Sequence, residues 1–419
     1  MRKLFAIIIV IINIFSLKVY AGERLSLGYI YATETSHIEI VEATRNSVNV
    51  VSPTYFDLSA KGRLKINNKI DERFVESMHE KGIKVTPFLS NHWERKRAQA
   101  ALKNPENLVN DIVEAINKYN FDGINVDLEN LELKDKDNLT NFVKLLRESL
   151  PKDKTLSVAV AANPENLEYS WLATYDYKNL AEYSDYLVLM AYDEHSYGGS
   201  EGTVAGIDFV EKSLQVILKD VSKDKVVLGI PLYGRFWKVG EDVGGEAIII
   251  GQIPKIIKKY KLVTKYDEKA QTPKIKLTIK NNESGPYVNG RYLEEGTYNI
   301  YYENENSIRA KLELVNNYDI LGTGLWALDN ESSEFWDYYK DALNHKEYET
   351  EKEIELRKEH EMLVEIIIKQ SFDRIHILPQ STENVYDASA EETDKKPNRF
   401  YGILLAIVPE KKKKKIKQV

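Results

Sequence analysis

The chain has 419 residues, of which 43% are hydrophobic and 29% are charged, and its formal net charge is -7. This length and apolar content allow a large core, either one large α/β barrel or two ordinary domains. An acidic chain binds nucleic acid poorly, so we expect no nucleic-acid partner. The sequence has no cysteine, and its histidines show no His-x-x-x-His or similar spacing, so we predict no metal and no cofactor.

The first 21 residues have the pattern of a secretory signal peptide. Arg2 and Lys3 precede an apolar run over residues 4–17, and the segment 19–21 places small residues where a signal peptidase cleaves. The apolar run is shorter than the ~20 residues that a spanning helix needs, so a membrane anchor is the alternative and no stable membrane span is expected. We therefore expect an exported protein, secreted or cell-wall associated, with a mature chain from about Gly22.

Apolar, β-branched segments alternate with helical patterns from residue 25 to about residue 345. The predicted strands are Leu25–Ala32, Val48–Phe56, Ile83–Leu89, Asp122–Glu129, Thr155–Ala162, Tyr186–Tyr192, Lys225–Gly234 and Gly322–Leu328. The predicted helices include Asp71–Lys81, Pro105–Tyr119, Lys136–Leu150, Asp208–Val221, Ser307–Asn317 and Glu334–Asn344. Eight strands that alternate with helices indicate an α/β fold, a (β/α)8 TIM barrel over residues 22–345. A doubly wound open sheet is the alternative, but no glycine-rich phosphate loop follows the first strand.

The pattern changes between about residues 238 and 300. Gly and Lys become frequent there, Thr272–Lys280 alternates like a strand, and Gly285-Pro286 marks a turn. A structureless loop of this length is rare in a compact domain. We therefore predict a small α+β insertion after strand 7 that forms one wall of a substrate groove.

Beyond the barrel the sequence becomes strongly charged. Residues 346–370 are dense in Lys and Glu with apolar positions between them, which suits an amphipathic helix. Residues 371–419 are typical of a flexible tail, and they end with the lysine run 411–415. Such a run can bind anionic wall polymers or lipid headgroups, but the composition favours a solvated tail.

The fourth predicted strand, Asp122–Glu129, carries two carboxylates on one face. Because side chains alternate along a strand, Asn125, Asp127 and Glu129 point the same way. Asp127 and Glu129 repel each other, so one of them can keep its proton near neutral pH, as a general acid must. Asp122 has the opposite parity, and with Gly123 we expect it to shape the strand entry. A surface strand with solvated charges is the alternative for a bare Asp-x-Glu pair.

Other polar and aromatic residues follow the later strands, where the active site of a barrel lies. Met190-Ala-Tyr192-Asp193 ends strand six, Arg235 ends strand seven and Trp326 ends strand eight. The block Asp-Gly-x-x-x-Asp-x-Glu at 122–129 resembles the signature of family 18 glycoside hydrolases, and the three later groups resemble the family's motifs on strands six to eight. The resemblance covers roughly residues 23–343.

The resemblance implies a retaining glycosidase in which the substrate's own 2-acetamido oxygen attacks the anomeric carbon and gives an oxazolinium intermediate. Glu129 would then protonate the leaving oxygen, Asp127 would orient the acetamido N–H, and Tyr192 would bind the acetamido oxygen. The other expected substrate contacts are Asn125, Asp193, Met190, Trp326, Tyr29 and Arg235. Core packing is the alternative for Met190 and Trp326, and a structural ion pair is the alternative for Arg235.

Two departures from the family pattern bear on the substrate. Asn125 stands where the family usually has Asp, and strand three ends in Ser90-Asn-His-Trp93 without the Ser-x-Gly-Gly of chitinases. The Asn form resembles the branch from spore-forming bacteria that cuts N-acetylglucosaminyl bonds in spore or cell-wall peptidoglycan. The expected partner is therefore an N-acetylglucosamine-containing polysaccharide, peptidoglycan or chitin, and we expect a monomer. A chitinase or an endo-acting enzyme on N-glycans is the close alternative, and a non-catalytic chitinase-like glycan-binding protein is the alternative from another class.

Overall fold

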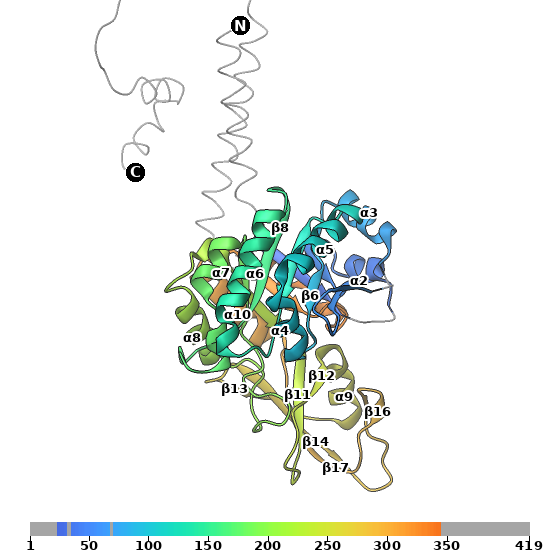
Figure 1. Ribbon diagram of the computed structural model, residues 1–419. Helices are drawn as coiled ribbons and strands as arrows, with labels where there is room; N and C mark the ends of the chain where they lie inside the picture. Colours follow the sequence, from blue (N-terminus) through green and yellow to red (C-terminus); the bar gives the residue numbers. More distant parts are fainter. Residues whose placement is uncertain (1–22, 32–34, 68–69, 345–419) are drawn as a thin grey trace, which may run out of the picture. The chain divides into compact units, whose positions relative to one another are not determined.

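The computed structural model describes residues 23–31, 35–67 and 70–344 (Figure 1). The predicted signal peptide (1–21), charged helix (346–370) and tail (371–419) lie outside the described residues.

Eight parallel barrel positions, here called staves and each made of one strand or of two consecutive short strands, close into a barrel. This confirms the predicted fold class. In order around the barrel they are β1 (Leu25–Ile30), β2 (Val50–Pro53) continued by β3 (Phe56–Leu58), β5 (Lys84–Val85) continued by β6 (Phe88–Ser90), β7 (Gly123–Asp127), β8 (Thr155–Ala161), β9 (Tyr186–Met190), β10 (Val226–Pro231) and β18 (Gly322–Trp326). β18 pairs with β1 and closes the sheet, and the short β4 (Leu64–Ile66) adds an antiparallel edge to β3.

Two staves are interrupted where single strands were predicted. The predictions Val48–Phe56 and Ile83–Leu89 are wrong in this respect, since each contains a break. Pro53 ends β2 and Pro87 separates β5 from β6. Proline has no N–H to donate to a sheet ladder, which explains why the pairing changes at these points.

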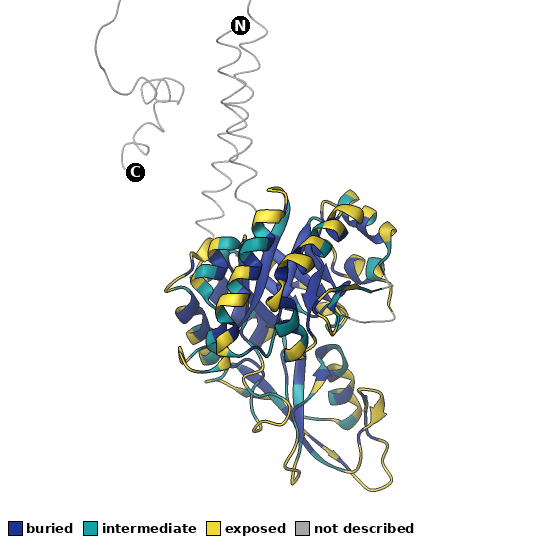
Figure 2. Cartoon of the chain, viewed as in Figure 1, coloured by how far each residue is buried: buried dark blue, intermediate teal, exposed yellow. Residues whose placement is uncertain are grey.

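A ring of helices covers the outside of the barrel. They are α2 (His37–Ala43), α3 (Glu72–Glu80), α4 (Arg95–Lys103), α5 (Pro105–Lys118), α6 (Lys136–Ser149), α7 (Tyr177–Tyr183), α8 (Ile207–Ile217), α10 (Glu305–Asn317) and α11 (Tyr339–Leu343). Figure 2 shows buried strands at the centre and helices that are exposed on their outer faces. In α5, Leu108, Ile112, Ala115 and Ile116 are buried at the spacing of one helix face. Burial of such faces holds each helix on the sheet.

Aromatic and branched side chains fill the barrel interior. Leu27, Tyr29, Val50, Phe88 and Val188, from four different staves, belong to one buried cluster that is separate from the cluster between sheet and helices. The interior is therefore a packed core rather than a pore, as in other barrels of this type, and substrate can reach only its mouth.

An antiparallel sheet interrupts the barrel after β10. Its strands are β11 (Tyr233–Lys238), β12 (Glu246–Ile249), β13 (Lys265–Asp267), β14 (Thr272–Ile279) and β17 (Gly296–Tyr301), with helix α9 (Ile253–Tyr260) and the hairpin β15 (Tyr287–Val288) and β16 (Arg291–Tyr292). The sheet begins at Tyr233, not at residue 238, and the predicted strand Lys225–Gly234 is wrong because β10 ends at Pro231. Figure 1 shows this insertion at one end of the barrel, where β10 leads into it.

One barrel loop fastens the insertion in place. Glu201, in the loop after β9, accepts hydrogen bonds from Lys274 (3.1 Å), Tyr301 (2.8 Å) and Asn299 (2.9 Å) on the insertion sheet. The indole N–H of Trp237 donates to the carbonyl oxygen of Gly199 in the same loop (3.2 Å). The insertion is thus a fixed wall beside the barrel mouth.

Candidate active site

Strand β7 carries two carboxylates to the mouth of the barrel. Asn125 and Asp127 alternate with Ile124 and Val126, and all four side chains are buried. The ladder between β6 and β7 ends at the pair Ser90–Asp127. Glu129 therefore lies two residues beyond the strand, whereas the sequence predicted it at the strand's last position.

Burial controls the ionisation of both acids. Asp127 is only 5% exposed, and burial raises its pKa to about 7, which nearby His92 partly offsets. Burial also raises the pKa of Glu129 well above its ordinary value, and the charges of Asp127 and Asp193 add to the effect. Asp127 Oδ1 has no hydrogen-bond partner within the described residues. The raised pKa favours the protonated form of Glu129, which can donate a proton, and Asp127 Oδ1 offers an unused acceptor.

Three neutral side chains, those of Tyr29, Asn125 and Ser157, are joined by hydrogen bonds in the barrel interior near Asp127. The hydroxyl of Tyr29 donates to Asn125 Oδ1 (3.2 Å), and Asn125 Nδ2 donates to Ser157 Oγ (2.8 Å). Tyr29 is 3% exposed and Asn125 is fully buried. Both predicted contact residues are thus buried and joined to each other by a hydrogen bond, and neither adds a charge beside Asp127.

The end of β9 brings Tyr192 beside Glu129. Both side chains line the same two hollows. Burial raises the pKa of the Tyr192 hydroxyl well above its ordinary value, so it stays a neutral hydrogen-bond donor. Gly229 on β10 leaves room for the ring, since a Cβ there would lie 2.8 Å from Tyr192 Cε1. Met190 lines the same hollows.

Asp193 is held by the insertion. Arg235 Nη2 donates to both carboxylate oxygens of Asp193 (2.7 and 2.8 Å), Arg235 Nε donates to Oδ1 (2.9 Å), and the Tyr233 hydroxyl donates to Oδ1 (2.5 Å). Arg235 lies on β11 and not at the end of strand seven. Two donors from one element fix the carboxylate geometry, as bidentate Arg–carboxylate pairs do.

Trp326 forms the wall of a hollow on one side of the acids. Its ring packs against Tyr29 (5.3 Å between centroids) and Phe88 (5.8 Å), which fixes its orientation. The peptide bond between Trp326 and Ala327 is cis. The hollow has a volume of about 340 Å³, and Asp127 and Glu129 lie among its lining residues. Its acids are Asp127, Glu129 and the ion-paired Asp193.

A second hollow adjoins the first, and the two together form a groove. The second hollow has a volume of about 500 Å³ and shares Trp93, Glu129 and Tyr192 with the first. Trp93 is 52% exposed, and its ring meets that of Trp171 edge to face at 5.6 Å. Exposed indole rings are well suited to stack on sugar faces. Glu129 thus lines both hollows of the groove, which meet at Trp93, Glu129 and Tyr192.

Four of these residues were not predicted as site residues: Trp93, Trp171, Tyr233 and Asn91. The amide of Asn91 bonds the backbone of Glu129 at both ends, with Nδ2 donating to the carbonyl oxygen (2.9 Å) and Oδ1 accepting from the N–H (2.8 Å). The departure of strand three from the chitinase pattern was a signal for Trp93, whereas Asn91 stands at the variable position of that pattern and carried none. For Trp171, on a short 3₁₀ helix (Trp171–Thr174), the sequence offered none.

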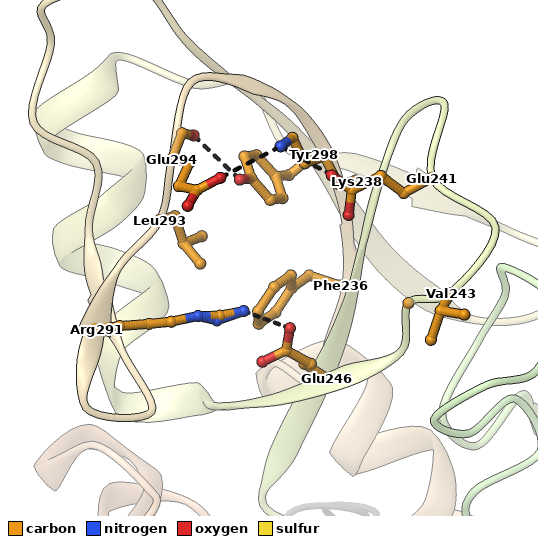
Figure 3. Close-up of a pocket in the computed structure, with 10 residues that line it drawn as sticks. Phe236, Lys238, Glu241, Val243, Glu246, Arg291, Leu293, Glu294 and Tyr298 are labelled. Atoms are coloured by element: carbon orange, nitrogen blue, oxygen red, sulfur yellow. Dashed lines mark hydrogen bonds and ion pairs between the residues drawn. The ribbon is translucent and has the colours of Figure 1, made fainter.

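A further hollow, of about 130 Å³, lies within the insertion (Figure 3). Arg291 pairs with Glu246 (2.5 Å) across its floor, and Lys238 pairs with Glu241 (2.9 Å). Phe236 lies between them. Each of the three carboxylates of this hollow is ion-paired, since Glu294 also lies 3.8 Å from Lys238, so it offers none of the unpaired acid chemistry of the barrel mouth.

No group of three or more His, Asp or Glu side chains within the described residues is arranged to hold a metal ion. Over the same residues, no helix is long and apolar enough to cross a membrane.

The fold and the site define a class: a (β/α)8 barrel with paired carboxylates at its mouth. The family model of glycosyl hydrolases family 18 matches residues 26–331, so the chain belongs to this family, as its motifs predicted.

The chain is similar to curated proteins and to solved structures. An uncharacterized glycosylase YvbX of Bacillus subtilis is 29% identical over 52% of this chain and 60% of its own length. The cortical fragment-lytic enzyme of the same organism is 26% identical over 57% of this chain and 53% of its own length. The chain thus spans little more than half of these relatives. The Bacillus cereus spore cortex-lytic enzyme SleL matches with a TM-score of 0.67 and 20% identity over 77% of this chain and 75% of that one. A Chromobacterium violaceum chitinase matches with a TM-score of 0.67 and 26% identity over 76% of this chain and 99% of that one.

Proposed function

We propose that the protein is a secreted, retaining glycosidase that cleaves β-linked N-acetylglucosamine bonds in spore or cell-wall peptidoglycan. The observation that carries the proposal is the pair of buried acids, Asp127 and Glu129, in a groove of two adjoining hollows that Glu129 lines in common. Burial raises the pKa of Glu129 well above its ordinary value, which favours the protonated form that a proton donor to a leaving oxygen requires.

The reaction proceeds in two steps. Glu129 gives its proton to the glycosidic oxygen while the bond from that oxygen to the anomeric carbon breaks. The acetamido oxygen of the same sugar forms the new bond to the anomeric carbon and gives an oxazolinium ion. Water then attacks the anomeric carbon, the bond from this carbon to the acetamido oxygen breaks and restores the acetamido group, and the water gives one proton to Glu129, so the configuration is retained.

The neighbouring side chains act on the acetamido group. The unused acceptor of Asp127 binds its N–H and stabilises the positive charge that develops on the ring. The neutral hydroxyl of Tyr192 binds its oxygen. Asp193 is occupied by Arg235 and Tyr233, so it is a poor nucleophile, and this supports attack by the substrate's own oxygen.

The relatives support peptidoglycan as the substrate. Two similar proteins carry the names cortical fragment-lytic enzyme and spore cortex-lytic enzyme. Chitin is the second candidate, because the Chromobacterium violaceum structure, 26% identical, is a chitinase.

Product analysis by mass spectrometry tests the activity and the substrate. The chain without residues 1–21 and its Glu129→Gln variant are incubated with purified peptidoglycan and with chitin oligomers in parallel. We expect products with reducing-end N-acetylglucosamine from peptidoglycan, and none from the variant. Release from chitin alone would change the assignment to a chitinase, and binding of either glycan without any product would indicate a glycan-binding protein.

Export is tested separately. The full chain, expressed in a Gram-positive host, should reach the medium or the wall with an N-terminus at about Gly22. Retention of an uncleaved chain inside the cell would contradict the proposed secretion.

A further inference from the structure

Asn91 extends the sheet beyond the point where its backbone ladder ends. The last backbone pair between β6 and β7 is Ser90–Asp127. After it the chain of β6 turns away, since His92 and Trp93 have positive φ values of 50° and 62°. Its backbone leaves the ladder at Asn91, yet the Asn91 side chain meets both the N–H and the carbonyl oxygen of Glu129.

The primary amide of Asn91 replaces a peptide group. It supplies one donor and one acceptor, and the backbone of Glu129 presents one acceptor and one donor. Asn91 is fully buried, so water does not compete for these two bonds. Beyond the end of a strand, such a pair fixes the backbone on which the Glu129 side chain depends.

We propose that Asn91 is a positioning residue for the proton donor Glu129, a role that rests on the proposed function. A carboxylate at position 91 could accept the N–H but could not donate to the carbonyl oxygen, and it would place a third carboxyl group beside those of Asp127 and Glu129. A side chain without an amide would leave both backbone groups of Glu129 unpaired. In Ser90-Asn-His-Trp93 the amide of Asn91 stands at the x position of the chitinase pattern Ser-x-Gly-Gly, and His92 and Trp93 stand at its two glycines with positive φ.

The opposite end of the barrel provides a matched control. Asn49 precedes β2 and uses its amide in the same way, since Oδ1 accepts from the N–H of Ser26 (2.9 Å) and Nδ2 donates to the carbonyl oxygen of Arg24 (3.0 Å). Asn49 is far from the groove and lines neither of its hollows. The variants Asn91→Ala and Asn49→Ala thus remove the same two kinds of hydrogen bond from the two ends of the barrel.

The test uses leaving groups that differ in their need for a proton. The substrates are purified peptidoglycan, whose leaving group is a sugar, and the methylumbelliferyl and dinitrophenyl β-glycosides of N-acetylglucosamine oligomers. A dinitrophenolate leaves without protonation, so the first step on this substrate, which kcat/KM reports, does not need Glu129 as an acid. We expect Asn91→Ala to lower kcat/KM on peptidoglycan about 100-fold, the scale of a small misplacement of a catalytic group, and to lower it far less on the dinitrophenyl substrate. Asn49→Ala should lower neither rate.

Each outcome supports or overturns the positioning role of Asn91. Equal losses on all substrates, or an equal effect of Asn49→Ala, would show that Asn91 is only structural. If Asn91→Ala does not fold, Asn91→Asp, which keeps the acceptor, is measured in its place and should show the same dependence on leaving group. If the wild-type protein cleaves none of the substrates, the proposed function has failed and the positioning role fails with it. Activity of the wild type that Glu129→Gln abolishes, without a leaving-group dependence in the Asn91 variants, would overturn the positioning role alone.

Discussion

The two ends of strand β7 use the same kind of side chain in opposite ways. At the N-terminal end, Asp122 Oδ2 accepts from the N–H of Val85 (2.7 Å) and lies 2.9 Å from His79 Nε2. At the C-terminal end, burial dominates the pKa of Asp127, whose Oδ1 has no partner in the part of the chain that the structure describes. Asp122 Oδ2 thus has two hydrogen-bond partners, whereas Asp127 Oδ1 has none among the described residues.

The arrangement of Asp122 recurs at the N-terminal ends of neighbouring staves. Asp185 precedes β9, and its Oδ2 accepts from the N–H of Leu156 on β8 (2.7 Å). Asn49 precedes β2 and accepts from Ser26 on β1. In each case a side chain that precedes one strand accepts a hydrogen bond from the backbone of the neighbouring strand. The N-terminal end therefore serves stability, and the C-terminal end gives up stability for chemistry.

The largest expected effect comes from the proton donor. Replacing Glu129 by Gln removes the proton that the leaving sugar needs, and activity on peptidoglycan should fall about 10²- to 10⁴-fold. The measurement is the initial rate of reducing-end release, with circular dichroism to show that the fold is intact. A variant that keeps most of the wild-type rate would contradict the assignment of Glu129.

At the other end of β7, Asp122→Ala should change stability and leave chemistry alone. It deprives the Val85 N–H of its acceptor and His79 of its partner, and the free energy of unfolding should fall by about 2–3 kcal/mol. Urea titration measures this loss, and kcat per folded molecule should equal that of the wild type. A large loss of kcat with unchanged stability would refute the division between the two ends.

Asp127→Asn should stabilise the protein at high pH. The pKa of Asp127 is about 7 in the folded protein and ordinary when unfolded, so the folded state holds the proton more tightly. The stability from that proton is fully present below the ordinary pKa of the carboxyl and is lost as the pH rises through 7. The Asn variant, which cannot ionise, should exceed the wild type by about 2 kcal/mol near pH 8, and by little near pH 4. Unfolding midpoints across this pH range check the sign, and a gain that persists at low pH would count against it.

The smallest expected effect concerns Asp185. Its side chain is 51% exposed and accepts one backbone N–H, so Asp185→Ala should cost about 1 kcal/mol or less and leave kcat unchanged. Comparison with Asp122→Ala by thermal unfolding would show how much the burial of the carboxylate strengthens its hydrogen bond to a backbone N–H of the neighbouring strand. A larger loss for Asp185 than for Asp122 would contradict the expected order.

The sequence predicted the parts of the site that lie within short motifs. Asp127 and Glu129 follow from strand alternation, and Tyr192 and Asp193 follow directly after an apolar strand. Asn91 could not be assigned because its partner lies 38 residues away and only the barrel register brings the two together. The interrupted staves and the start of the insertion were misplaced because an apolar run does not reveal where its pairing partner changes.

Helix α4 was missed for a different reason. It begins Arg95-Lys-Arg and buries only Ala98, Ala101 and Leu102, so its apolar face is narrow and made mostly of alanine. A pattern of this kind has little hydrophobic contrast, and contacts with the barrel rather than periodicity hold the helix in place.

The glycine at the start of β7 has a consequence for how relatives of this protein are recognised. A Cβ on Gly123 would lie 1.9 Å from the carbonyl oxygen of Thr155 on the next strand, and Asp122 is engaged with Val85 and His79. The Asp-Gly half of the signature therefore serves barrel assembly, and the Asp-x-Glu half serves the proposed bond cleavage. The two halves can therefore separate: a relative without the proton donor would still gain stability from Asp-Gly, and a search keyed to that half would gather it with the enzymes.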